Sequence, residues 1–322
     1  MSYLRNSLGS VRRKPAVDRG AGRRGEGMAE SYSSKLQLWE GWMPAMVKGP
    51  APPMPGDRSF PTPNYRLESA DRLYAGETLN ANGRIREGAE PFTLQWFLEI
   101  ENARHSRYGG WIPRLLEFVK HGGETLLGLG NGLGTDWVQY ARHGAQVIAC
   151  CPSTERLALI QRNFALRGLE AAFLHANPTT IPVESASIDV VCIANLLEEV
   201  ADPSIVIDEV YRLLKPGGKV LAVIPARFDL DFWLRRCLPW RSWFRSRNAA
   251  NPGTTLFSAR MLRQLFGRFV EARIYKRHLR RAEVPHLWRW LPHPLLERMF
   301  GRLLIFKAFK PLSAAMPVPL AA

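Results

Sequence analysis

The sequence predicts an α/β fold in which helices cover both faces of a mainly parallel sheet, and three observations lead to this prediction. Residues Thr125 to Leu129 form a short apolar run that passes into a glycine-rich loop, and a helical pattern follows from Thr135 to His143. Apolar runs and amphipathic segments then alternate as far as residue 224. The string Lys215-Pro216-Gly217-Gly218 ends one helical segment immediately before another apolar run. Strands that alternate with helices form right-handed units and a parallel sheet.

Each predicted element has its own local signal. Strands are expected as short apolar runs because a parallel strand is buried on both faces. Ser153 and Ser258 are good N-cap residues for the helices that follow them. The predicted strands are residues 125–129, 145–150, 171–175, 188–194, 219–224, 269–275 and 303–309, and the helices between them are residues 135–143, 154–166, 204–214 and 258–266. Two further helices with apolar stripes are predicted between residues 90 and 120.

The candidate binding residues lie where the predicted strands end. In an open parallel sheet, ligands bind beyond the carboxyl ends of the strands, and a glycine-rich turn lets the backbone approach a nucleotide-like ligand closely. The candidates from the glycine loop and from the ends of the later strands are Gly128, Gly130, Asn131, Gly132, Gly134, Cys151, Pro152, Asn177, Pro178 and Asn195.

Three segments together resemble a known family. Residues 126–136, 179–191 and 213–218, in this order, resemble the class I S-adenosylmethionine-dependent methyltransferases of the methyltransferase type 11 kind. The resemblance runs from about residue 91 to residue 225, with a weaker tail to residue 311. It implies a Rossmann-like seven-stranded methyltransferase sheet with helices on both faces, an N-terminal helical cap, and a basic insertion before the last strand.

The chain departs from this family at three acidic positions. The resemblance implies carboxylates where this sequence has Gly128, Cys151 and Asn177. A thiol is a weak hydrogen-bond acceptor, so Cys151 is expected to hold ribose hydroxyls poorly. Losing a hydrogen bond to a charged group costs about 1.5–3 kcal/mol. The resemblance implies S-adenosylmethionine as the methyl donor, and the departures predict that its binding is weakened.

No catalytic residue can be named from the sequence, because methyl transfer depends mainly on holding the reacting atoms in line. Glu198 and Glu199 follow the strand that ends at residue 194, and we interpret them as a solvated pair. His105 and Tyr108 precede the glycine loop and are interpreted as packing residues. Asp136 is expected in the first turn of a helix, where its charge suits the helix dipole.

Charge and composition divide the chain into parts. Residues 1–65 are predicted to be a disordered basic and proline-rich tail, residues 66–120 an N-terminal helical cap, residues 121–311 the Rossmann-like domain, and residues 312–322 a second tail. Residues 226–322 carry 19 Lys and Arg but only 5 Asp and Glu. Nearly all of the net charge of +15 therefore belongs to the segment after residue 225.

Two segments of that basic region, residues 228–257 and 276–300, mix tryptophans with arginines. Three interpretations stay open: a lid packed on the protein, contact with an anionic membrane surface, or contact with nucleic acid, of which nucleic acid is the least favoured. Free cysteines without metal-ligand spacing predict no metal site and a reducing, cytoplasmic setting, with peripheral attachment to a membrane as an open alternative.

The function predicted from these observations is methyl transfer from S-adenosylmethionine to an unidentified small or lipid-like acceptor. Two alternatives come from other classes of protein. One is a non-catalytic relative that keeps the fold as a binding or scaffold protein, and the other is an RNA-binding methyltransferase-like protein. The oligomeric state is not predicted, and the acceptor is left open because this fold serves many acceptors.

Overall fold

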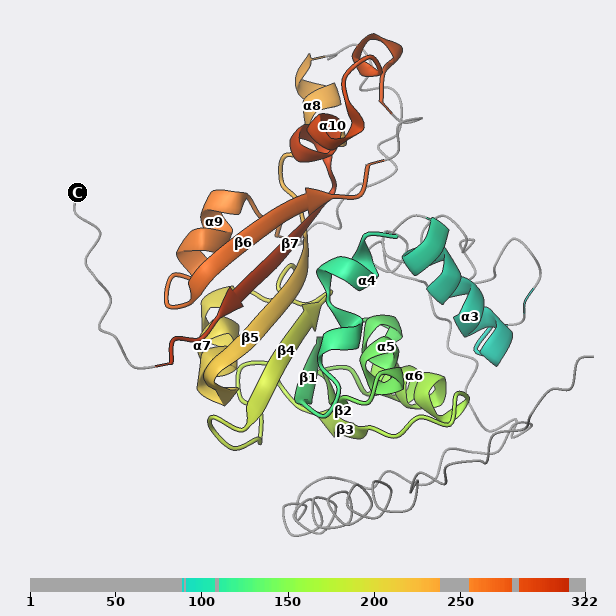
Figure 1. Cartoon of the computed structure of the whole chain (residues 1–322), viewed down its shortest axis with the longest axis vertical. Helices are drawn as coiled ribbons and strands as arrows, with labels where there is room; N and C mark the ends of the chain where they lie inside the picture. Colours follow the sequence, from blue (N-terminus) through green and yellow to red (C-terminus); the bar gives the residue numbers. More distant parts are fainter. Residues whose placement is uncertain (1–88, 90, 108–109, 238–254, 280–283, 313–322) are drawn as a thin grey trace, which may run out of the picture. The chain divides into compact units, whose positions relative to one another are not determined.

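The computed structural model describes residues 89, 91–107, 110–237, 255–279 and 284–312 (Figure 1). The predicted tail over residues 1–65, the first part of the predicted cap, Tyr108, the Trp- and Arg-rich residues 238–254, and residues 313–322 lie outside this part of the chain.

A seven-stranded sheet with the order β3-β2-β1-β4-β5-β7-β6 forms the centre of the fold. The first five strands are parallel, and β7 runs antiparallel to both of its neighbours, β5 and β6. The strands are β1 (Thr125–Gly130), β2 (Gln146–Cys151), β3 (Ala172–His175), β4 (Ile188–Ala194), β5 (Leu214–Pro225), β6 (Val270–Arg277) and β7 (Leu303–Phe309). The predicted fold class, a Rossmann-like sheet of seven strands, is confirmed.

One predicted boundary is wrong. The sequence predicts a turn at residues 215–218 before a strand that begins at residue 219, but β5 begins at Leu214, directly after helix α7 (Pro203–Leu213). Leu214 already pairs with Ile188 of β4, and the next pair joins Val190 to Lys219. The Pro-Gly-Gly segment is therefore an irregularity inside the strand pairing.

Helices cover both faces of the sheet, as Figure 1 shows. On one face, α5 (Thr135–Arg142) and α6 (Thr154–Ala165) contribute Trp137, Tyr140, Ile160 and Phe164 to a core that also contains alternate residues of β1, β2, β4, β5 and β7. On the other face, Phe266 follows α9 (Ala259–Leu265) and stacks on Phe306 of β7 with ring centroids 4.1 Å apart.

The segment before the sheet is helical, as the apolar stripes predict. It consists of α3 (Leu94–Asn102), the π-helical turn η2 (Ala103–Arg107), α4 (Ile112–Leu115) and the 3-10 turn η3 (Phe118–Lys120). Thr93 caps α3 by accepting a hydrogen bond from the backbone of Trp96. Trp96, Phe97 and Ile100 are buried together with Leu133 of the glycine loop and Leu159 of α6. These contacts hold the segment, called here the cap, over the carboxyl end of β1.

The chain between β6 and β7 forms a separate small module. Its helices are η5 (His286–Trp288) and α10 (His293–Phe300), and they share a small core with α8 (Leu230–Cys237), which follows β5. We call α8, residues 278–279 and residues 284–302 the insertion module. Among the described residues, no helix combines the length and the apolar character that crossing a bilayer requires.

The cap is also tied to the sheet by charge. The Glu117 carboxylate accepts hydrogen bonds from Lys219 of β5 (2.7 Å) and Lys307 of β7 (3.0 Å), and all three side chains are largely buried. Burial acts to raise the pKa of Glu117, but the bonds and charges of the two lysines outweigh it and lower the pKa to about 2.

Replacing Glu117 by glutamine is therefore expected to lower the free energy of unfolding by roughly 1–3 kcal/mol at pH 7. Because the folded pKa lies below the value of the unfolded chain, this contribution is fully present above about pH 4.5 and disappears as the pH falls through 2. Denaturant unfolding of the wild type and of Glu117→Gln at several pH values measures it. Glu170→Gln, at an exposed position, is the matched control. A stability difference that stayed constant as the pH fell toward 2 would contradict this assignment.

Candidate functional site

The glycine loop lies where β1 and β4 end side by side. A Cβ atom added at Gly130 would lie 1.8 Å from the carbonyl oxygen of Ala194, so only glycine lets the two strands approach this closely. Gly134 has a left-handed backbone (φ 70°) and caps the start of α5. Asn131 closes the loop against β4 by donating its backbone N–H to the Asn195 carbonyl (3.2 Å). The loop is therefore held tightly on the end of β4.

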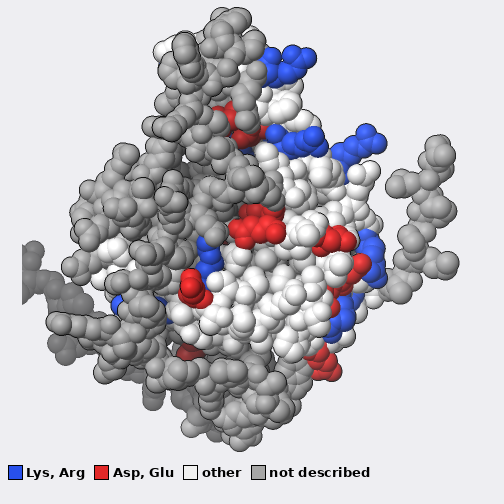
Figure 2. Space-filling view, turned by 180° about the vertical axis from the view of Figure 1, so that it is seen from behind, with Lys and Arg blue, Asp and Glu red and all other residues white. Residues whose placement is uncertain are grey.

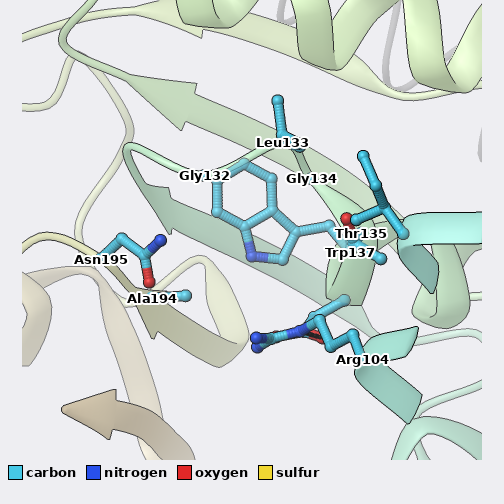
Figure 3. Close-up of a pocket in the computed structure, with 10 residues that line it drawn as sticks. Arg104, Gly132, Leu133, Gly134, Thr135, Trp137, Ala194 and Asn195 are labelled. Atoms are coloured by element: carbon cyan, nitrogen blue, oxygen red, sulfur yellow. Dashed lines mark hydrogen bonds and ion pairs between the residues drawn. The ribbon is translucent and has the colours of Figure 1, made fainter. Parts of the chain in front are cut away.

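A pocket opens at this place, shown in Figure 3. It contains about 440 Å³ of empty space, including the part that opens to solvent. Three parts of the chain line it: the cap, the glycine loop with the start of α5, and the end of β4. The lining residues are Ile100, Arg104, Gly132, Leu133, Gly134, Thr135, Asp136, Trp137, Ala194 and Asn195.

The Trp137 indole explains the glycine at position 128. A Cβ atom at Gly128 would lie 2.4 to 2.7 Å from three atoms of the indole, Cδ2, Cε2 and Cγ, so the ring lies flat on the backbone of residue 128. Trp137 is only 2% exposed, and Figure 3 shows its ring beside the glycine loop. The ring thus occupies the space into which a carboxylate at position 128 would extend.

Next to it, Asp136 joins α5 to the cap. The Arg104 guanidinium holds both oxygens of Asp136: Nε donates to Oδ1 at 2.7 Å, and Nη2 donates to Oδ2. His105 Nε2 lies 2.9 Å from Oδ1. Burial acts to raise the pKa of Asp136, but the Arg104 charge and the bonds from Arg104 and His105 hold that pKa well below its usual range. The predicted place of Asp136 in the first turn of a helix is confirmed, whereas its partner Arg104 was not predicted.

Asn131 links the end of β2 to the segment after β4. Its Oδ1 accepts a hydrogen bond from the Cys151 thiol at 3.4 Å, and its Nδ2 donates to Oε2 of Glu199 at 2.6 Å. The Arg156 guanidinium, in the first turn of α6, donates to the Asn131 carbonyl. Cys151 itself is fully buried. At the position where the family resemblance implies a carboxylate, the structure therefore has a thiol covered by an amide.

The structure brings most of the predicted binding residues together, but not all of them. Gly132, Gly134 and Asn195 line the pocket, while Gly130, Asn131 and Cys151 support it from behind. Two predicted residues are placed differently. Asn177 is exposed, and its side-chain oxygen accepts two hydrogen bonds from Thr179 within its own turn. Pro178 is buried beside it, and neither residue lines the pocket. Pro152 carries a carbonyl that lies 3.0 Å from His175 Nε2.

The interpretation of Glu198 as a solvated residue is wrong. Its side chain is 2% exposed, and neither carboxyl oxygen has a hydrogen-bond partner within bonding geometry. Burial raises the pKa of Glu198 to about 8, and the neighbouring charge of Glu199 adds to this effect. The Glu198 carbonyl accepts a hydrogen bond from the backbone of Thr255 (2.8 Å), so a returning segment of the chain covers this turn. Sequence spacing alone could not show that cover.

The cysteines of this region are not reactive groups. Burial raises the pKa of Cys150 and of Cys192 to about 12, so both remain protonated thiols at neutral pH. Cys150, Cys151 and Cys192 are all free and buried. The described residues contain no cluster of His, Cys, Asp and Glu side chains that could hold a metal ion.

Comparison with known proteins identifies the central part of the chain. Residues 126–222 match the family model described as "Methyltransferase domain". This region is therefore similar to a methyltransferase domain. It contains β1, β2, β3, β4 and most of β5, so the match covers the glycine loop and the strand ends around the pocket.

Curated relatives of the methyltransferase domain include two quinone enzymes. The chain is 36% identical over 99 residues to a demethylmenaquinone methyltransferase of Clavibacter sepedonicus, which covers 31% of this chain and 40% of that protein. It is 29% identical over 161 residues to a ubiquinone biosynthesis O-methyltransferase of Psychrobacter cryohalolentis, which covers 47% of this chain and 60% of that protein. The chain thus spans about half the length of these relatives.

A solved structure of similar fold is the phosphoethanolamine N-methyltransferase 2 of Haemonchus contortus. It is 19% identical, with a TM-score of 0.46, and the similarity covers 68% of this chain and 58% of that one.

The contact between Gly128 and Trp137 predicts a measurable coupling. Gly128→Ala is expected to lower the free energy of unfolding by about 1–3 kcal/mol, because its Cβ atom meets the indole. Trp137→Ala in the same chain should remove most of that added cost. Denaturant unfolding of the four proteins of this double-mutant cycle measures the coupling. Gly132→Ala is the control, since the nearest atom to a Cβ there is 3.8 Å away. Strictly additive effects would show that the ring does not limit position 128.

The buried Glu198 predicts a pH effect. Its folded pKa of about 8 exceeds the ordinary value of 4.5, so its neutral form is stable in the fold below about pH 4.5 and stability is lost as the pH rises through 8. Glu198→Gln should therefore be more stable than the wild type above pH 8, by a few kcal/mol at about 1.4 kcal/mol per pKa unit, and similar to it near pH 5. Thermal unfolding across this pH range measures the difference, with Glu170→Gln, at an exposed position, as the control. Parallel stability profiles for the wild type and Glu198→Gln would show that residue 198 titrates normally.

Proposed function

We propose that this chain transfers a methyl group from S-adenosylmethionine to a lipid-like quinone acceptor. The observation that carries the proposal is the pocket at the carboxyl ends of β1 and β4, which lies inside the methyltransferase domain and is lined by the glycine loop, Arg104 and Asn195. Such a position is where ligands bind in sheets of this kind.

The pocket residues fit the amino-acid end of the methyl donor. Gly132 offers open backbone, since a Cβ atom there would have its nearest neighbour, Asn195 Nδ2, at 3.8 Å. Arg104 lines the same pocket, and although its guanidinium already binds Asp136 through Nε and Nη2, its positive charge would attract the carboxylate of the donor. Asn195 supplies an amide that can donate and accept hydrogen bonds. These three residues would hold the methionine portion against the glycine loop.

The other end of the donor is expected to bind more weakly. The Cys151 thiol, which would face the ribose hydroxyls, is covered by the Asn131 amide. Asn131 would have to turn away for a ribose to reach the end of β2, which breaks its bonds to Cys151 and Glu199. Because of this cost, we expect the donor to bind less tightly than it would with a carboxylate at residue 151.

When bound, the donor supplies an electrophilic methyl group on a positively charged sulfur. The residues of this chain would orient that group and exclude water from it. Trp137 would partly replace a carboxylate at position 128 in stabilising the positively charged donor, because an aromatic ring stabilises a nearby cation by roughly 0.5–2 kcal/mol. Asp136 stays ionised at the pocket wall, but its charge is largely neutralised by Arg104, so the ion pair adds little net charge to the site.

The relatives support the class of acceptor. Two of them are named for demethylmenaquinone and for ubiquinone biosynthesis, and both names refer to quinones with lipid chains. The proposed acceptor is therefore the reduced, quinol form of such a quinone. A nucleophilic oxygen or carbon of the quinol would bond to the methyl group, the bond from the methyl carbon to sulfur would break, S-adenosylhomocysteine would leave, and the proton of the acceptor would pass to solvent.

A second candidate function is a binding or scaffold role without catalysis. The observation that favours it is that both strand-end positions lack a carboxylate for a structural reason: the Trp137 ring covers Gly128, and the Asn131 amide covers Cys151. A chain of this kind would keep the fold and lose the methyl donor.

Calorimetric titration with S-adenosylmethionine and S-adenosylhomocysteine separates the two candidates. We expect binding by the wild type, and Cys151→Asp should tighten it about ten- to a hundredfold, because a carboxylate adds charge-assisted bonds to the ribose hydroxyls. Gln264→Glu adds the same charge at an exposed position of α9, outside the pocket, and is the matched control, expected to change little. Binding by Cys151→Asp alone would favour the scaffold role, and absence of binding by all three proteins would rule out the proposed function.

Transfer itself is tested with the wild type, isotope-labelled S-adenosylmethionine and a demethylated quinol in detergent. The expected product carries one labelled methyl group, detected by mass spectrometry. Donor binding without any labelled quinone would keep the methyltransferase assignment and exclude this acceptor class.

A further inference from the structure

The insertion module has a hydrophobic core of its own. Leu230 of α8, Leu279, Val284 and the inner face of α10 (Leu296 and Phe300) are buried together. Trp288 stacks on Phe300 with parallel rings 5.0 Å apart. In Figure 1 the module lies beyond the carboxyl ends of β5 and β6 and before the start of β7. The apolar side chains of its inner face are therefore buried within the module itself, whereas its outer face carries exposed side chains.

The outer face of the module is apolar where a solvated helix would be polar. Leu295 and Met299, one helical turn apart on α10, are each 43% exposed. Trp290, just before the helix, is 76% exposed. Single exposed apolar side chains are ordinary, but several large ones within ten residues on one small module indicate a surface that contacts something apolar.

Phe228, just before α8, joins the same surface. The Lys276 ammonium donates hydrogen bonds to the carbonyl oxygens of both Phe228 and Met299, so the backbones of these two exposed residues meet at Lys276 although they are 71 positions apart in the chain. We call Phe228, Trp290, Leu295 and Met299 the apolar patch. The Arg227 guanidinium lies 5.7 Å from the centroid of the Phe228 ring, and the exposed Arg298 directly precedes Met299 on α10.

The acidic side chains around the patch are already engaged. Glu297 points the other way on α10 and accepts a hydrogen bond from Arg277 at 3.0 Å. Asp231 lies 3.8 Å from Arg302. Asp229 caps the start of α8 by accepting from the backbone of Phe232. The segment of sequence that contains the patch is strongly basic, since residues 226–322 carry 19 Lys and Arg against 5 Asp and Glu. Figure 2 shows Lys and Arg side chains on the upper part of the chain, where Figure 1 places the module.

We propose that the apolar patch docks on the surface of an anionic lipid bilayer. The positive charges near the apolar patch favour an anionic bilayer over other partners. A tryptophan and aliphatic side chains next to arginines fit the boundary between lipid headgroups and acyl chains, where aromatic rings and apolar groups insert and cations meet acidic lipids. A second copy of this chain would bring an equally basic surface and be repelled. Nucleic acid is less suited, because Leu295 and Met299 offer no ring on which a base can stack.

This proposal does not rest on the methyl donor or on a quinone. If the proposed function also holds, docking places the enzyme where a lipid-like acceptor is dissolved. If the donor does not bind, the surface remains, and its test below has no step that involves methyl transfer.

The test is sedimentation of the full chain with vesicles of phosphatidylcholine alone and with an increasing fraction of phosphatidylglycerol. We expect binding to rise with the anionic fraction and to fall as salt is added. The variant Trp290→Gln/Leu295→Gln/Met299→Gln should lower the bound fraction at least about tenfold, because it withdraws the apolar side chains from the acyl boundary. Circular dichroism checks that it folds; the three side chains lie outside the module core.

Each change on the module has a matched control outside it. Val119→Gln/Ile205→Gln removes exposed apolar side chains outside the module and should bind as the wild type does. Arg298→Gln should weaken binding at low salt more than Arg273→Gln, an equally conservative change at an exposed position of β6. Three results would overturn the proposal: no binding of the wild type to anionic vesicles, equal binding by the triple variant, or binding to single-stranded RNA that the triple variant loses while vesicles are not bound.

Discussion

The contact between the Trp137 indole and the backbone of Gly128 is the constraint on which the rest of the site depends. A flat ring in contact with a strand leaves no room for a side chain at that strand position. It also places the first turn of α5, because Trp137 and Asp136 are consecutive. Once the indole lies on β1, the Asp136 carboxylate is directed to the cap, where Arg104 and His105 bind it. One packing contact thus determines the pocket wall, the helix and the attachment of the cap.

The carboxylates near this site lie at other positions than the family resemblance implies. Family resemblance places carboxylates at the ends of β1 and β2, where this chain has Gly128 and Cys151. The structure instead places Asp136 on α5 and Glu199 after β4, each bonded to a group of the pocket wall. A cationic ligand would therefore meet charge that is already partly neutralised by Arg104 or shared with Asn131. Such partly neutralised charge attracts a cationic ligand less strongly than free carboxylates at these positions would.

Local sequence signals were enough for the sheet and the glycine loop, because apolar runs, capping serines and glycines act within a few residues of themselves. These local signals could not predict which distant side chain or segment packs on a given residue. Nothing in the sequence shows that Trp137, nine positions later, lies on Gly128, or that Thr255 returns to cover Glu198. Asn177 illustrates the same limit, since its side chain bonds Thr179 in its own turn instead of facing the pocket. The Trp-rich residues 238–254 lie outside the described part of the chain, so their open interpretations stay predictions.

The pairing of Arg277 with Leu303 at the end of the β6–β7 hairpin has a wider consequence. The two ends of the inserted chain lie one strand spacing apart, about 4.8 Å, whatever the length of the segment between them. Because the entropy of closing such a loop changes only slowly with its length, residues can be added or lost there with little effect on the sheet. The insertion module can therefore change in length and sequence, and with it the surface that the module exposes, while the sheet and the pocket beside the glycine loop stay the same.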